Sequence, residues 1–241
     1  MTLSYTVYVD EIEEEAERLV DLAAAGLQTS VRTCPGWTVE DLVLHVAGIY
    51  RRNAAQIVAP DPLVRVEVTP PHGLQPIAYL EASQMALVDA LRERQPEDPC
   101  WNFTNDNETL AFVARRIAHE SAIHRVDAEL TRGLAHAIDP ELAADGLDER
   151  IDLLLRRAVT PVAAHPLGGS ICIVCSDMPT SWVIDAARGA VKIRAGRGPA
   201  NAAVVGTASD IFCFSWNRPT IRPLQVTGDR SIIEAWQPFS S

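Results

Sequence analysis

Glu120 and His124, four residues apart, are the pair in this sequence whose types and spacing best suit chemistry. They lie in a segment, Phe112–Glu129, whose residue pattern predicts a single helix. Four residues advance a helix by about one turn, so both side chains leave the same stripe of its surface. A carboxylate and an imidazole placed in this way can bind one metal ion, and Zn²⁺ accepts such a mixed pair.

His45 is the candidate for a third ligand. It lies on the apolar side of another predicted helix, which begins after Thr38 and runs to about Val58. A lone histidine in such a place is often a packed, hydrogen-bonded residue, and Glu120 with His124 can equally form a surface pair. Glu120, however, aligns with the apolar residues of its own helix. A buried carboxylate is unfavourable unless it is paired or bound to metal, which favours the ligand interpretation.

The dipeptide His119-Glu120 suggests the HExxH zinc motif, but the spacing does not fit. That motif needs two histidines four residues apart. His119 and His124 are five residues apart, about 500° of helix rotation, so their side chains diverge by about 140°. His119 is therefore expected to flank the site rather than to bind the metal.

The first part of the chain is expected to form a four-helix bundle. Apolar residues recur at helical spacing in four segments, 8–26, 38–58, 77–94 and 112–129. Thr38, followed by Asp41 three residues later, resembles a capping box at the start of the second helix. Two long connections, 59–72 and 95–107, join the helices, and the first contains a possible extended piece at 63–68. Long connections of this kind indicate a bundle with a crossover.

The second part of the chain is expected to be a smaller α+β domain. A fifth helix is predicted over 140–158, and two further helices over 209–216 and 231–236. Short alternating or apolar segments predict antiparallel strands at 170–175, 181–186, 191–195, 202–205 and 224–227. Cys172 and Cys175 form a CxxC pair, but in a strand they face opposite sides, so core packing is the better interpretation. The expected domains are 1–136 and 137–241.

Composition excludes several classes of function. The 241 residues are 47% hydrophobic and carry a formal net charge of −11, without a basic cluster larger than a pair of arginines. Nucleic-acid binding is therefore not expected. No segment has the pattern of a signal peptide or the ~20 apolar residues of a membrane span. The chain is expected to be cytoplasmic and away from the membrane, and its five cysteines do not suggest a disulfide framework.

Several stretches resemble the mycothiol-dependent maleylpyruvate isomerase family. Thr33–Val39, together with Asp41 and His45-Val46, resembles the family's first signature, and Arg115–Asp127 resembles the second. Segments 208–211, 216–218 and 226–229 are similar to its C-terminal domain, which is related to sterol carrier proteins. The resemblance implies a DinB-like, metal-binding four-helix bundle followed by a small sterol-carrier-like α+β domain.

The resemblance also implies a site and an activity. The metal ligands would be His45, Glu120 and His124, with a divalent metal, Zn²⁺ expected, as cofactor and mycothiol as co-substrate. Three protein ligands leave coordination positions open, as in catalytic zinc sites, and a bound thiol there becomes a thiolate. The implied activity is isomerisation or S-transfer on a small electrophilic substrate, in an actinobacterial source. The alternative is a non-catalytic metal-containing protein that binds an apolar small ligand in its C-terminal domain, or a bundle that mediates association alone.

Three further residues are candidates for supporting roles. Asp127, one turn beyond His124, either orients that imidazole or is a solvated helix residue. Arg218 and Arg222 could each supply a cation to a carboxylate substrate, or be exposed arginines near a helix end. Arg218 is the stronger candidate because it lies in a stretch that resembles the family.

Overall fold

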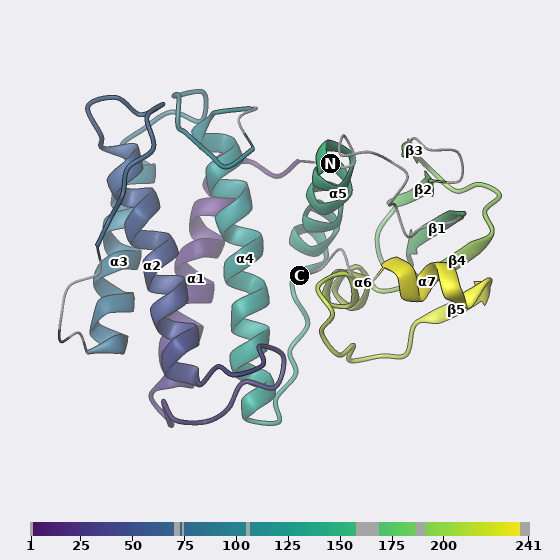
Figure 1. Cartoon of the computed structure of the whole chain (residues 1–241), viewed down its shortest axis with the longest axis horizontal. Helices are drawn as coiled ribbons and strands as arrows, with labels where there is room; N and C mark the ends of the chain where they lie inside the picture. The colour runs from purple at the N-terminus through teal and green to yellow at the C-terminus, as the bar shows by residue number, and fades with distance from the viewer. Residues whose placement is uncertain are drawn as a thin grey trace. The chain divides into compact units, whose positions relative to one another are not determined.

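The chain folds into two compact units, and each is described by itself. The computed structural model describes residues 2–69, 73, 75–104, 107–157, 169–186 and 191–236. One unit comprises Leu3–Ala135, and the other comprises the residues from His136 onward together with Met1–Thr2 (Figure 1). The predicted fold class, a four-helix bundle followed by a small α+β unit, is confirmed. Within the described residues, no helix is both long and apolar enough to cross a membrane.

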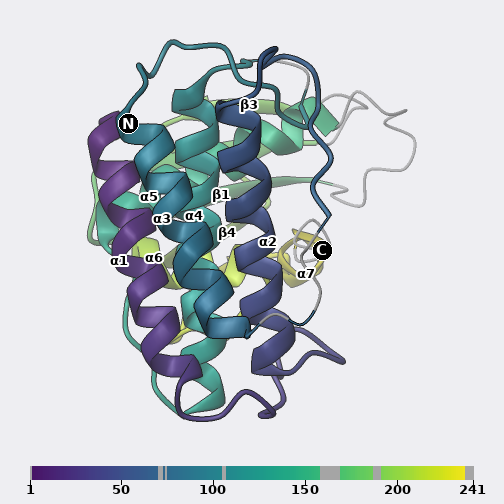
Figure 2. The ribbon, with the colours of Figure 1, turned by 90° about the vertical axis from the view of Figure 1, so that its left-hand side faces the viewer.

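The first unit is a bundle of four helices that lie side by side, as Figure 2 shows. They are α1 (Tyr5–Ala23), α2 (Val39–Ile57), α3 (Pro76–Arg92) and α4 (Leu110–Thr131). The predicted capping box begins α2: Thr38 accepts a hydrogen bond from the backbone N–H of Asp41, whose carboxylate accepts one from the backbone N–H of Thr38. These bonds satisfy backbone donors that have no partner inside the helix.

Helix α4 is unusual in the number of polar side chains that it buries. The buried polar residues on it are His119, Ser121, His124, Arg125, Asp127 and Glu129. Polar groups removed from water must find partners inside the protein. Ser121 lies 2.7 Å from the hydroxyl of Tyr50 on α2, and Arg125 donates to Glu15 on α1. The α4 helix is therefore held in the bundle by specific polar contacts as well as by apolar packing.

In the part that the structure describes, the second unit contains a five-stranded sheet and three helices. The elements are α5 (Pro140–Arg157), β1 (Ser170–Cys175), β2 (Ser181–Asp185), β3 (Lys192–Ala195), β4 (Ala202–Gly206), α6 (Ala208–Ser215), β5 (Gln225–Gly228) and α7 (Arg230–Trp236). The predicted last residue of the fifth helix, 158, lies outside the described residues. Cys172 packs with Val174 and Val183 in an apolar cluster, and Cys175 is also buried. Both cysteines therefore belong to the core.

The sheet corrects one expectation, because it is mixed rather than fully antiparallel. Its strand order is β3-β2-β1-β4-β5, and β4 pairs in parallel with β1, with Ile173 opposite Val204. The connection 196–201 carries the chain from the β3 edge across to the free edge of β1. Alternation of side chains identifies a strand and its faces, but it carries no information about the direction of its neighbour.

Candidate metal centre and its pocket

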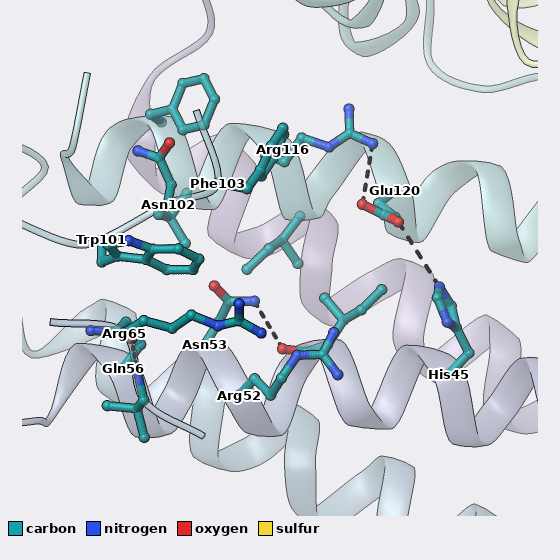
Figure 3. A pocket seen from close by; sticks show the side chains of 15 residues that line it. His45, Arg52, Asn53, Gln56, Arg65, Trp101, Asn102, Phe103, Arg116 and Glu120 are labelled. Carbon is teal, nitrogen blue, oxygen red and sulfur yellow. Dashed lines mark hydrogen bonds and ion pairs between the residues drawn. The ribbon is translucent and has the colours of Figure 1, made fainter. Parts of the chain in front are cut away.

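The three predicted metal ligands converge on one point of the bundle. His45 comes from α2, and Glu120 and His124 come from α4, with donor atoms within 4.8 Å of one another. Glu120 Oε1 lies 4.0 Å from His45 Nε2 and 3.9 Å from His124 Nε2. Figure 3 shows His45 and Glu120 facing each other across the space between the two helices. The arrangement offers two imidazole nitrogens and one carboxylate oxygen to a single position.

His124 is fixed in orientation by Asp127. Its Nδ1 atom lies 3.0 Å from Oδ2 of Asp127, whose side chain is fully buried. An ionised carboxylate only accepts hydrogen bonds, so Nδ1 carries the proton and Nε2 keeps its lone pair for the site. Cys34, from the loop before α2, donates its S–H to the same carboxylate oxygen over 3.6 Å. Cys34, His124 and Asp127 therefore form a second cluster of possible ligands that shares His124 with the first.

Glu120 is held by Arg116, one turn earlier on α4. Arg116 Nη2 donates to Glu120 Oε2 over 3.1 Å, which leaves Oε1 facing the two histidines. Burial acts to raise the pKa of Glu120, but the positive charge of Arg116 and the nearby imidazoles outweigh it, so this pKa lies below its ordinary value. The carboxylate is therefore ionised at neutral pH, the form that binds a cation.

His45 is the most exposed member of the three, with 36% of its side chain accessible. Its ring lies against Trp37, with ring centroids 4.9 Å apart, and edge-on to His124 at 5.0 Å. Burial, followed by the proximity of His124, lowers the pKa of His45. The imidazole is therefore neutral at neutral pH, and its Nε2 lone pair is available.

A cavity of about 370 Å³ within the first unit is lined by two of the three residues, His45 and Glu120. One face of α2 and one face of α4 form two of its walls, and loops before and after α3 complete it. Among its lining residues are the following: His45, Ile49, Arg52, Asn53, Gln56, Arg65, Val66, Trp101, Asn102, Phe103, Phe112, Val113, Arg116, Ile117 and Glu120. In Figure 3, His45 and Glu120 lie at one end of this group and Trp101 and Arg65 at the other.

Part of the cavity wall is the loop before α3, and hydrogen bonds from the Gln56 side chain hold this loop in place. The possible extended piece at 63–68 is not a strand in the structure. Instead, the buried Gln56 amide donates to the carbonyl oxygens of Pro62 and Val64, and its oxygen accepts from the backbone N–H of Val66. One side chain on α2 thus satisfies backbone groups that a neighbouring strand would otherwise satisfy. Arg65 extends from this loop over the Trp101 ring, 5.5 Å from its centroid.

Other residues singled out from the sequence lie elsewhere. His119 is fully buried and packs edge-on against Tyr8 of α1, with ring centroids 6.1 Å apart, so it is not among the converging donors. Arg218 and Arg222 belong to the second unit. Arg218 donates to the carbonyl of Trp216 over 2.6 Å, and the backbone N–H of Arg222 donates to Asp210. The catalytic role of Arg218 stays a prediction.

Sequence reasoning missed several residues that line the cavity. Arg52, Asn53 and Gln56 share the α2 face of His45 at helical spacing, a signal that was present in the sequence. Trp101 and Arg65 come from two different loops, which α3 separates in the sequence. Nothing in the local pattern of such loops indicates which cavity they line.

Comparisons with known proteins agree with this architecture. A family model, the mycothiol maleylpyruvate isomerase N-terminal domain, matches residues 9–129, half of the chain, and this range includes all three converging residues. Two crystal structures, both of the mycothiol-dependent maleylpyruvate isomerase and one of them a histidine-to-alanine mutant, are similar in fold with a TM-score of 0.66. Each is 14% identical and covers 95% of this chain and 97% of its own.

No curated protein matches the chain. The similarity to the two crystal structures extends over both units and supports the fold, while the family match rests on the helical unit that carries the cavity. By that match, the chain belongs to the family defined by the mycothiol maleylpyruvate isomerase N-terminal domain.

Proposed function

We propose that this protein is a metal-dependent enzyme that uses a low-molecular-weight thiol, mycothiol, for isomerisation or S-transfer on a small electrophilic substrate. The observation that carries the proposal is the convergence of His45, Glu120 and His124 on one point, beside a cavity that His45 and Glu120 line. The family match and the titles of the two similar structures, which name mycothiol and maleylpyruvate, support the choice of thiol and reaction class.

The three donors fit a divalent metal in chemistry and nearly in spacing. Two imidazoles and an ionised carboxylate match the His₂Glu ligand set of catalytic zinc sites. Donors around a tetrahedral zinc ion lie about 3.4 Å apart, so the observed 3.9 and 4.0 Å need a closure of about half an ångström. Small side-chain rotations supply that movement. His45, Glu120 and His124 would hold the metal, and Zn²⁺ is the ion that this set best suits.

The remaining groups support these ligands. Asp127 fixes the tautomer of His124, and Arg116 restrains one oxygen of Glu120 so that the other faces the site. A bound divalent metal would lower the pKa of a coordinated thiol, which makes the reactive thiolate available at neutral pH. Trp37 packs against His45 and limits the positions that its ring can take.

The cavity suits a thiol and a small electrophile together. Its volume of about 370 Å³ lies within the range of small-molecule sites, and its walls mix apolar and polar side chains. In isomerisation, the thiolate sulfur forms a bond to one carbon of a cis double bond, and rotation follows about the resulting single bond. The electron pair held on the conjugated carbonyl then returns, the C–S bond breaks, the double bond re-forms as trans, and the thiolate is released. In S-transfer by addition, the C–S bond persists in the product and the adjacent carbon takes up the proton that the thiol lost.

The carrier alternative has less support among the described residues. One cavity in the described part of the second unit is smaller, about 180 Å³, and its wall contains Asp177, Asp210 and Arg222. Charged walls favour polar ligands over apolar ones. The role predicted for Arg218, binding of a substrate carboxylate, is tested separately by an Arg218→Gln variant, for which a rise in KM for charged substrates alone would support that role.

Metal analysis and a turnover assay test the proposed function. The purified wild-type protein should contain about one divalent ion per chain, and His45→Ala should lose most of it. His136→Ala, which removes an exposed histidine outside the cavity, should retain the metal. Mycothiol-dependent conversion of maleylpyruvate, or of other small electrophiles, should follow metal content. Equal metal in His45→Ala and wild type would refute the three-ligand site, and turnover that does not depend on thiol would refute the mechanism.

A further inference from the structure

Arg52 has an unusual position on the cavity face of α2. It lies seven residues, about two turns, after His45, with Gly48 between them on the same face of the helix. A Cβ atom added to Gly48 would lie 3.4 Å from Nη1 of Arg52. The guanidinium therefore folds back along the helix, over the space that a side chain at position 48 would occupy, toward the end of the cavity that holds His45.

The charge of Arg52 is not matched by a carboxylate in the described part of the chain. Of the other lining arginines, Arg116 pairs with Glu120 at 3.1 Å and Arg65 pairs with Glu67 at 2.9 Å. No described carboxylate forms an ion pair or hydrogen bond with the Arg52 guanidinium.

The charge of the cavity wall is opposite to that of the whole protein. The chain carries a formal net charge of −11, yet the lining residues include three arginines and one carboxylate, Glu120. A concave site lined by one sign of charge attracts ligands of the other sign. The opposite end of this wall is the Trp101 ring with Arg65 above it, so the wall also offers an apolar surface for the body of a ligand.

We propose that Arg52 is the anion-recognition residue of this cavity and that it binds the carboxylate of a small organic acid. A guanidinium binds a carboxylate through two parallel N–H···O bonds, which fixes orientation as well as charge. With its carboxylate on Arg52, the ligand places its next carbons toward the His45 end of the cavity. This inference deepens the proposed function, and it rests on that function for the assumption that the ligand reacts at the His45 end of the cavity. The anion anchor then lies in the same unit as the metal donors.

Binding of a non-reactive dicarboxylate tests the inference without turnover. Titration calorimetry of succinate and of its uncharged diamide, succinamide, would be performed on the full-length wild-type protein, Arg52→Gln and Arg51→Gln. Arg51 is the matched control because it is the preceding exposed arginine on the same helix and does not line the cavity. Arg52→Gln should weaken succinate binding by about tenfold or more and leave succinamide binding unchanged. Arg51→Gln should bind both ligands like the wild type.

A second variant separates position from charge. Gly48→Leu keeps Arg52 but fills the space over which its guanidinium lies, so it too should weaken succinate binding several-fold. Equal succinate affinities in Arg52→Gln and wild type, or an equal loss in Arg51→Gln, would overturn the proposal, as would wild-type protein that does not prefer succinate to succinamide. Metal content must be unchanged in Arg52→Gln. If the wild type contains no metal or shows no turnover, but succinate binding depends on Arg52 as expected, the result would count against the proposed function and not against the role of Arg52.

Discussion

Nδ1 of His124 lies 3.0 Å from Oδ2 of Asp127, and this contact leaves Nε2 as the ring nitrogen that faces Glu120. The two residues are one helical turn apart on α4, and the aspartate is fully buried. The pair therefore forms before any ligand binds, within a single helix. Contacts of this kind orient metal-binding histidines and raise their basicity.

Asp127→Asn should weaken metal binding while the bundle stays folded. The amide has the same shape but lacks the charge that favours a protonated Nδ1, so metal affinity should fall by about 10- to 100-fold. Competition with a chromophoric chelator measures this change. Asp21→Asn, which removes a negative charge from the exposed surface of α1, is the control and should bind metal as the wild type does. Equal affinities in the two variants would show that Asp127 does not act on His124.

Arg116→Gln should make metal binding sensitive to acid. The pKa of Glu120 lies below its ordinary value because Arg116 and the nearby imidazoles together outweigh the effect of burial. Without the charge of Arg116 the pKa rises, and a protonated carboxyl does not bind a cation. As the pH is lowered, metal affinity should therefore begin to fall at a higher pH in the variant than in the wild type, and it should recover as the pH rises. Parallel pH profiles of the variant and the wild type would contradict this account. Arg51→Gln is the control, because it removes a positive charge from a residue that does not line the cavity.

Two arginines allow a comparison of buried and exposed ion pairs in one bundle. Arg125 is fully buried between Glu15, at 2.7 Å, and Glu129, at 2.9 Å. Arg125→Met should lower the free energy of unfolding by roughly 3–5 kcal/mol, because two carboxylates lose their buried partner. Arg92→Gln breaks an exposed pair with Glu13 and should cost less than about 1 kcal/mol. Urea unfolding of both variants measures the difference, and similar losses would contradict this interpretation.

The cysteines should differ sharply in reactivity. Burial raises the pKa of Cys100 and of Cys175 to about 11, so at pH 8 only about 0.1% of each is thiolate. Cys34 is only partly buried and should be the first residue labelled by an iodoacetamide reagent at pH 8. Mass spectrometry of the digested protein identifies the labelled site. Cys34→Ser should remove the fast reaction, and early labelling of Cys100 or Cys175 would show that their surroundings open in solution.

The sequence was informative where the evidence is local to one helix. The spacing of Glu120 and His124 predicts their common direction, and Thr38 with Asp41 predicts the start of α2, both of which the structure shows. The placement of His45 beside them depends on how α2 and α4 pack, which helical period alone does not determine. The family resemblance supplied that information.

Features that depend on residues far apart in the chain could not be predicted from the sequence. The parallel pairing of β4 with β1 depends on a crossover connection, and the alternation of side chains along a strand does not predict such a connection. Cys34 reaches Asp127 although 93 positions separate them. The direction of the Arg52 side chain depends on the absence of a side chain at Gly48, a feature that becomes meaningful only with the cavity in view.

Gln56 has a consequence for how such a site can change during evolution. Its hydrogen bonds to the loop go to backbone atoms of Pro62, Val64 and Val66, so these bonds do not depend on which side chains the loop carries there. Substitutions at positions 65 and 66 can therefore alter the recognition surface without rebuilding the wall. Substrate specificity can then change through point mutations in this loop, without insertions and without a rearrangement of the bundle.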